Sequence, residues 1–161
     1  MEEEVKAWLA AARAFSWVDR VRSRAALERA MALSANVTDA LLRAHTRAYW
    51  GHWYARFRGW REEDAEACTT VIAAARQVGE RSLLSLHVAR YCYFQYARSD
   101  YQAVCRTADA GLPLALDAGQ HFDYLYYQYY RAQALLHLGQ WGDMGGKIPA
   151  RQRRAAWPKK R

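Results

Sequence analysis

The chain has 161 residues, of which 52% are hydrophobic, 14% aromatic and 25% charged. This length suits a single domain, and this composition excludes intrinsic disorder for most of the chain. The net charge of +8 is concentrated at one end, because residues 145–161 contain seven of the 24 Lys and Arg residues and no acid. The remaining 17 basic and 16 acidic residues nearly cancel, so the body of the chain has no charge bias toward nucleic acid.

The cysteines and the first residues are typical of a protein from a reducing compartment. Cys68, Cys92 and Cys105 show no C-x-x-C spacing and have apolar neighbours, so we expect buried free thiols. Met1–Glu4 is acidic where a secretory signal would be basic, and every apolar stretch is too short to span a bilayer. We therefore expect a cytoplasmic location and no membrane contact.

The segments between the few prolines and glycines are rich in strong helix formers. Gly79 stands where a left-handed residue would end one helix, and Ser99 with Gln102 fits a capping box that would begin another. Pro113 lies inside an expected helix, where we expect a kink or a break. Residues 91–96 alternate with period two, as a strand would, but their flanks are helical and we expect a helix there too. The expected helices are 3–15, 18–34, 38–57, 61–78, 81–97, 100–117 and 121–138.

Two short patterns recur at a spacing of 40 residues. Arg76–Glu80 recurs loosely as Leu116–Gln120, and Arg98–Tyr101 recurs as Leu138–Trp141. Each period holds an aromatic-rich segment, a polar turn and an Ala-rich segment, which is the pattern of a repeated helical hairpin. A single hairpin cannot bury its apolar face alone, so neighbouring hairpins must stack. The sequence predicts an all-α fold, an α-α superhelix (solenoid) of about three and a half hairpins.

The aromatic residues gather in the first helix of each hairpin or in the turn that follows it. Seventeen of the 22 aromatic residues lie in 49–60, 91–101 and 122–130. Side chains of this size carry most of the burial between helices in a layered protein, so we expect these segments to hold the hairpins together.

The hairpin resembles a tetratricopeptide repeat stretched from 34 residues to about 40. In that family the first helix carries a large residue followed by a small one at its tightest packing point. The matching pairs here are Trp50-Gly51, Tyr91-Cys92 and Arg131-Ala132, the last without its large member. The family's tyrosine, three residues further on, is present as Tyr54, while Gln95 and Leu135 stand at the other two places. The match covers about residues 38–144, and residues 1–37 look like a less regular preceding hairpin.

The long period and the linker around Arg76–Arg81 look like the helical-repeat regions of large bacterial ATP-dependent LuxR-type transcriptional regulators. In such regulators the repeats act as a sensor and docking arm, and the ATPase and DNA-binding domains lie elsewhere. This sequence contains no phosphate loop of the G-x-x-x-x-G-K-[ST] type and no evident helix-turn-helix. The resemblance therefore implies a non-catalytic binding module, the arm or a fragment of a bacterial transcriptional regulator.

We place the repeat domain at residues 1–144 and a basic tail, expected to be disordered, at 145–161. Periodicity stops at Met144, where a second helix should pair with 121–138. The face of 121–138 left uncovered is expected to favour self-association.

The family resemblance implies a binding groove along the first helices of the hairpins. Transferred position by position, its lining is His52, Arg56, Tyr93, Tyr96, Tyr126, Tyr129 and Gln133. Tyrosine rings offer flat area together with a hydrogen bond, which suits a protein or peptide partner or a small effector ligand. For any single tyrosine, the alternative is packing between hairpins.

We expect no enzymatic activity, no cofactor and no metal. The histidines are His45, His52, His87, His121 and His137, of which the first two share a helix face. A metal site needs three or four convergent ligands, and the acids at 62–64 are explained by the start of a helix. A pocket that holds a buried carboxylate or histidine with a displaced pKa would instead favour a helical enzyme.

The basic tail supports a second hypothesis, which is sequence-independent binding of nucleic acid through residues 147–161. Clustered cations gain affinity by releasing counterions, but without a fold to read bases they confer no sequence preference. Removal of residues 147–161 should abolish salt-dependent retention of the protein on immobilised DNA. Equal retention of the shortened chain would eliminate this hypothesis.

Overall fold

The structure is a computed structural model that describes residues 1–140 and 142. This part of the chain consists of helices and turns without strands. Each predicted range agrees with one helix to within two residues at either end, and 91–96 is helical as expected. The helices are α1 (Glu2–Phe15), α2 (Arg20–Ser34), α3 (Ala40–Arg58), α4 (Glu62–Val78), α5 (Arg81–Ala97), α6 (Tyr101–Asp117) and α7 (His121–His137).

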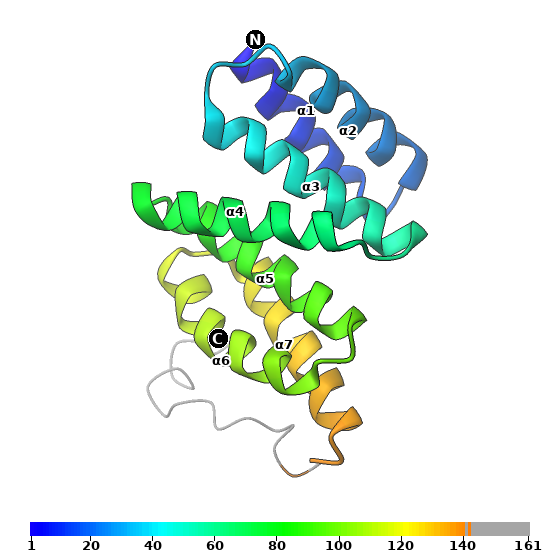
Figure 1. Ribbon diagram of the computed structural model, residues 1–161, viewed down its shortest axis with the longest axis vertical. Helices are drawn as coiled ribbons and strands as arrows, with labels where there is room; N and C mark the ends of the chain where they lie inside the picture. Colours follow the sequence, from blue (N-terminus) through cyan, green and yellow to red (C-terminus); the bar gives the residue numbers. More distant parts are fainter. Residues whose placement is uncertain (141, 143–161) are drawn as a thin grey trace, which may run out of the picture.

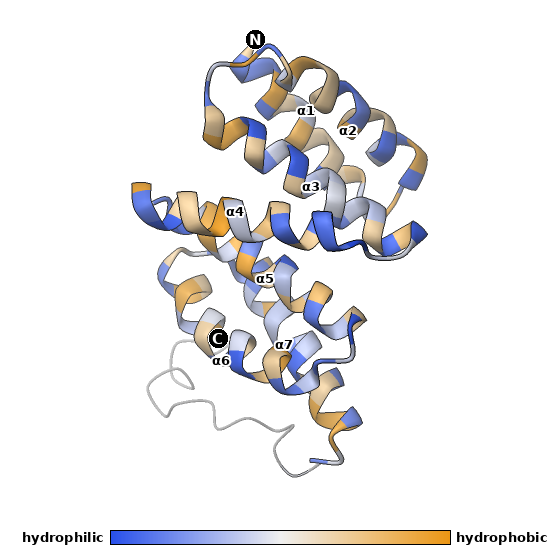
Figure 2. Ribbon diagram, in the orientation of Figure 1, coloured by the Kyte–Doolittle hydropathy of each residue, from blue (hydrophilic) through white to orange (hydrophobic). Residues whose placement is uncertain are grey.

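Helices that follow one another in the chain pack against one another in space, from α1 on α2 to α6 on α7 (Figure 1). The helices therefore form the stacked α-α superhelix that the repeat predicts. Apolar and polar residues alternate along every ribbon in Figure 2. Each helix thus offers an apolar stripe to its neighbours rather than a wholly apolar surface.

The core is divided into three clusters that follow the chain order. The first joins α1, α2 and α3, and the second joins α5, α6 and α7. A small third cluster connects these two through α3, α4 and α5, and it consists of Ala55, Ala65, Cys68 and Phe94. This serial arrangement of cores is what a solenoid requires, because each layer is buried only by its neighbours.

The four helices from α4 to α7 each have 17 residues and end in the same way. Each is followed by a residue in the left-handed conformation, namely Gly79, Ser99, Gly119 and Gly139, with φ between 61° and 78°. The N–H of the residue after the left-handed one donates to the carbonyl five residues earlier, at 2.8 to 3.0 Å. This bond gives a partner to one of the carbonyls that the end of a helix leaves without one. The predicted role of Gly79 is confirmed. Because the left-handed residues follow one another at intervals of 20 positions, the unit that repeats from α4 to α7 is a single helix with its turn.

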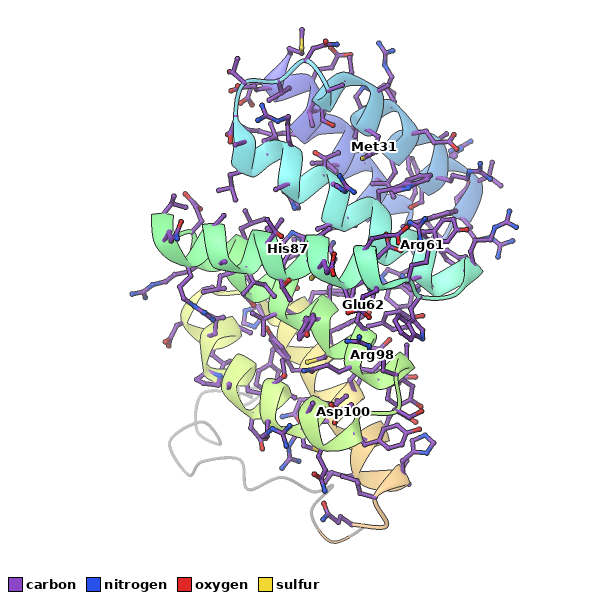
Figure 3. The ribbon with its side chains drawn as sticks, in the orientation of Figure 1. Met31, Arg61, Glu62, His87, Arg98 and Asp100 are labelled. Carbon is purple, nitrogen blue, oxygen red and sulfur yellow. The ribbon has the colours of Figure 1, made fainter. Side chains whose placement is uncertain are left out.

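The predicted capping box at Ser99 is wrong. Ser99 has φ 61° and belongs to the left-handed turn that ends α5, so it does not begin α6. The residue that begins α6 is Asp100, labelled in Figure 3, whose side chain accepts a hydrogen bond from the Ala103 N–H at 3.0 Å. A carboxylate oxygen caps the first turn as well as a hydroxyl would. The residue that caps α6 is therefore Asp100, one position after the predicted Ser99.

Pro113 does not end α6, which continues as one helix from Tyr101 to Asp117. A proline in a helix removes the N–H that would bond to the carbonyl four residues earlier, here that of Asp109. Both Pro113 and Asp109 lie on the exposed side of the helix, so water can satisfy the freed carbonyl. Of the two outcomes expected from the sequence, a kink or a break, the break does not occur.

The pair Trp50-Gly51 marks a close approach between α3 and α4. A Cβ atom at Gly51 would lie 2.7 Å from Oδ1 of Asp64, so only glycine fits there. Asp64 is buried and accepts two hydrogen bonds from Arg61, at 2.7 and 2.8 Å. The same end of α4 is tied to α5, because Arg98 pairs with Glu62 (Figure 3). These acids therefore have structural partners.

The first helices of the hairpins are unevenly spaced. α5 packs along α7, whereas α3 and α5 approach each other at only a few positions. Long side chains fill the space between α3 and α5, and the turn between α1 and α2 reaches across to the start of α7. There the ring of Trp17 lies 6.1 Å from that of Phe122. A partly enclosed space remains between these four elements.

Replacement of Ser99 by glycine should stabilise the protein, because Ser99 holds a left-handed conformation that glycine adopts more easily. A non-glycine residue in this conformation costs about 1 kcal/mol or more, so Ser99→Gly should raise the free energy of unfolding by about 1 kcal/mol. Gly119 has the same conformation with open space around it, and Gly119→Ser should lower the free energy by a similar amount. Urea unfolding of both variants measures this pair of changes. Equal stability of the two variants would contradict a left-handed residue at these positions.

Candidate functional site

A cavity of about 300 Å³ lies between the α1–α2 turn and helices α3, α5 and α7. It occupies the place where α3 and α5 diverge, and we call it the central cavity. Its lining comes from residues that are far apart in the sequence but meet because the superhelix curves. They are Arg13, Ser16, Trp17, Tyr49, His52, Trp53, Arg56, Leu86, Ala89, Arg90, Phe122, Asp123 and Tyr126.

A second cavity, of about 450 Å³, continues from the first along α7. The two share Trp17, Arg56, Phe122 and Tyr126, so they form one continuous depression, which we call the central groove. The second cavity adds Leu125, Tyr129 and Tyr130. Phe122, Leu125 and Tyr129 are the exposed large apolar residues of α7, with 45%, 64% and 57% of their surfaces accessible. The uncovered apolar face of this helix thus lies along the groove, and self-association through it stays a prediction.

Four of the seven predicted groove residues meet in the central groove. His52 and Tyr126 share a hydrogen bond of 2.9 Å across the central cavity, which ties α3 to α7. The guanidinium of Arg56 lies over the ring of Trp17 at 4.3 Å, where the two cavities join. Tyr129 stands further along α7 in the second cavity. These contacts gather side chains from positions 17, 52, 56, 126 and 129 on one surface.

The other three predicted residues lie outside the lining of both cavities. The hydroxyl of Tyr93 donates to the carbonyl of Ala55 at 2.9 Å, and its ring packs against Tyr130. Tyr96 shares a hydrogen bond of 3.1 Å with His137. Gln133 is half-buried on α7. For Tyr93 and Tyr96 the alternative reading, packing between hairpins, describes the contacts seen.

Sequence analysis missed Arg90, the most buried cation of the central cavity. Its guanidinium lies 3.7 Å from the ring centre of Tyr49, only 5% of the residue is exposed, and Nη1 has no hydrogen-bond partner in the described structure. Burial lowers the pKa of Arg90, although a guanidinium keeps its charge at neutral pH. A signal was present, because Arg90 lies 40 residues from both Trp50 and Tyr130 and puts a charge at an aromatic position of the repeat.

Asp123 is the acid of the central cavity and was also missed. It is almost fully buried, and it accepts a hydrogen bond from Ser85 Oγ at 3.0 Å. Burial raises the pKa of Asp123, while the hydrogen bond from Ser85 and the charges of Arg13 and Arg90 act in the opposite direction. Asp123 lies in the first turn of α7, where a carboxylate also interacts favourably with the helix dipole.

Three histidines are buried or half-buried around Arg90, and two of them pair with each other. His45 Nδ1 lies 2.7 Å from His87 Nε2, so one ring donates to the other. Burial and the charge of Arg90 lower the pKa of His45 to about 3, and they lower the pKa of His52 and of His87 well below 6.5. All three rings are therefore neutral at physiological pH.

Cys68 lies beside His87 but has the wrong chemistry for a nucleophile. Its Sγ lies 3.8 Å from His87 Nδ1 and donates to the His87 carbonyl at 3.2 Å. Burial raises the pKa of Cys68 to about 12, so the thiol stays protonated. Cys68 and Cys92 are buried free thiols as expected, whereas Cys105 is half-buried.

The described residues contain no group of three or more His, Cys, Asp or Glu side chains that could hold a metal ion. Within the same part of the chain, none of the helices has the length and apolar character needed to cross a bilayer. The tail at 145–161 lies outside the described residues, so its nucleic-acid binding stays a prediction.

Comparison of the chain with protein-family models, with curated proteins and with solved structures gives no match. The resemblance to tetratricopeptide repeats and to LuxR-type regulators therefore stays a prediction.

The neutral histidines should make the protein sensitive to mild acid. A group with a lowered folded-state pKa binds its proton first in the unfolded chain, so stability is lost as pH falls below 6.5. Each histidine contributes about 1.4 kcal/mol per pH unit well below that value. Asp123, whose pKa is raised, acts with the opposite sign at lower pH.

Urea unfolding between about pH 7.5 and pH 5 measures this slope above the range in which most carboxylates titrate. The variant His45→Phe should reduce the slope of the free energy of unfolding against pH by the contribution of one histidine, about 1.4 kcal/mol per pH unit. Stability that is constant over this range would show that the buried histidines bind protons in the folded state.

Proposed function

We propose that this chain is a non-catalytic binding module of the helical-repeat type, which holds its partner in the central groove. The observation that supports this most strongly is the gathering of exposed apolar side chains around a preformed concavity. Trp17, Phe122, Leu125 and Tyr129 all keep large exposed fractions and all line the groove. Soluble proteins rarely leave such side chains together on the surface unless they bind something.

The shape of the groove favours a ligand that enters it with little rearrangement. The first helices of three hairpins form its walls: α3 is held by the first core cluster, and α5 and α7 are held together by the second. A rigid wall reduces the entropy lost on binding. The central cavity, at about 300 Å³, is at the lower end of the range for small-molecule sites, and the second cavity extends it in the way a short peptide would need.

We further propose that the module serves as the sensor or docking arm of a bacterial transcriptional regulator. Its support is the 40-residue hairpin together with the resemblance of the linker between hairpins. An effector that contacts both the α1–α2 turn and α7 would stabilise one curvature of the arm, and curvature is the property such an arm can pass to a neighbouring domain.

One observation favours a catalytic alternative. The central cavity holds a buried carboxylate, Asp123, and a neutral histidine, His52, both with displaced pKa values. Such groups are common in active sites, but they also occur in structural networks. Here Asp123 is bonded to Ser85, and His52 is bonded to Tyr126. Ser85 is not a lining residue, and burial raises the pKa of Tyr126 well above 10, so its hydroxyl stays protonated. Binding therefore accounts for the arrangement better than catalysis does.

The groove is tested by removing its most exposed ring. Trp17 is 60% exposed, so Trp17→Ala should change the free energy of unfolding by no more than about 0.5 kcal/mol. A ligand or peptide found by its stabilisation of the wild-type protein should lose about 10-fold or more in affinity for this variant, because an aromatic wall is removed. Calorimetry of such hits measures the change.

Trp60 provides the matched control, because it is exposed in the turn between α3 and α4 and stacks on Arg98 outside the groove. Trp60→Ala should leave the affinity unchanged. Hits that bind both variants equally well would place the binding surface elsewhere. Conversion of a bound hit into a product, lost in Asp123→Asn, would establish the catalytic alternative.

A further inference from the structure

Three arginines line the central cavity, and each lies on an aromatic ring instead of pairing with an acid. Arg90 lies over Tyr49 at 3.7 Å, and Arg56 lies over Trp17 at 4.3 Å. Arg13, at the edge, is 5.9 Å from the ring centre of Phe122. None of the three forms a salt bridge with the acids of the described chain, although six other arginines do. A ring holds a guanidinium flat and leaves its N–H groups directed outward.

Two residues that line the same cavity each carry a buried hydrogen-bond donor without an acceptor. The donors are Nη1 of Arg90 and Nε1 of Trp53, both enclosed and both without a partner among the described residues. A buried donor without an acceptor is costly, and a buried charge without a counterion is more so. Both atoms can only donate, so the group that would satisfy them must be an acceptor.

The lining residues of the cavity carry a net positive charge, which favours a negatively charged acceptor on the ligand. Asp123 is the one acid among the lining residues, and its Oδ2 is already bonded to Ser85. No contact within 4.0 Å joins it to Arg90, Arg56 or Arg13 as an ion pair. The lining therefore carries an excess of positive charge, and the buried Arg90 holds its share of it away from bulk water, where an anion gains most from it.

The remaining walls determine the body of the ligand. The rings of Trp17, Trp53, Phe122 and Tyr126 surround the space, and its volume of about 300 Å³ admits a single ring system rather than a folded chain. Flat apolar rings pack best against such walls.

We propose that the central cavity binds a small organic anion, whose carboxylate or phosphate lies against Arg90 and whose flat apolar body packs against the wall formed by Trp17 and Phe122. This inference depends on the proposed binding function and names the chemical class of the ligand. The more exposed arginines, Arg56 and Arg13, attract the anion. Arg90 is the buried cation whose charge the anion would neutralise.

The probes are indole-3-acetate, phenyl phosphate and neutral indole-3-acetamide, which has the same body as the first without its charge. We expect an anionic probe to bind at least 10-fold more tightly than the amide in isothermal titration calorimetry, and to raise the melting temperature. Comparison of the first two probes tells whether the site takes carboxylates or phosphates. An amide that binds as well as both anions overturns the proposal.

The decisive variant is Arg90→Met, which keeps an unbranched apolar side chain and removes the charge. We expect loss of the preference for the anion and, in the absence of probe, a melting temperature equal to or above that of the wild type. A purely structural arginine would give the reverse, a lower melting temperature with the preference intact. Arg90→Lys, which keeps the charge without the guanidinium fork, should give an intermediate affinity.

Arg76→Met is the matched control, because Arg76 is exposed on α4 and is not part of the cavity lining. It should bind the anions as the wild type does. Anion binding that is unchanged in both Arg90→Met and Trp17→Ala would assign it to another cation and overturn the inference. Probe binding that is lost in Trp17→Ala but equal for the anions and the amide keeps the groove function and removes only the anion.

Discussion

A buried polar layer between α3, α5 and α7 determines how the two halves of the superhelix meet. Arg90 lies on Tyr49, His87 pairs with His45, and Tyr126 bonds to His52. Polar groups of this kind need partners at defined distances, so they hold the helices at a fixed separation instead of letting them collapse together. The backbones of α3 and α5 therefore stay apart, and the central cavity is the space that this separation leaves.

The contact between α5 and α7 shows how two first helices pack when no such polar layer separates them. There the facing side chains are Cys92, Tyr127, Tyr130 and Ala134, and the helices pack closely along their lengths. Two interfaces of the same repeat thus differ because one carries an arginine and histidines where the other carries tyrosines and small residues. In a solenoid each interface depends only on its neighbours, so one layer can be adapted for binding without loss of the next.

Much of the fold could be predicted from the sequence because it depends on local signals. Helix formers, Gly79 and the 40-residue recurrence gave the helices and their order, and the fold class is confirmed. The 20-residue unit was hidden because Ser99 takes a left-handed position that glycine holds in the neighbouring turns. A preference for glycine is a tendency of a few kilocalories at most, and tertiary packing can override it. Of the kink or break expected at Pro113, the break does not occur for a similar reason, since the cost of a proline depends on which side of the helix faces water.

The sequence by itself determined which segments are helices, how they repeat and where the aromatic residues concentrate, since each of these depends on neighbours within one or two turns. The tertiary structure decided which side chains face the groove. Tyr93 and Tyr96 fell between helices, while Trp17, Arg90 and Asp123 came together from three separate elements. The direction of a side chain on a helix follows from spacing, but whether it meets solvent, a ring or an open cavity depends on how far apart the helices stand, and that distance is set by contacts between residues up to about a hundred positions apart.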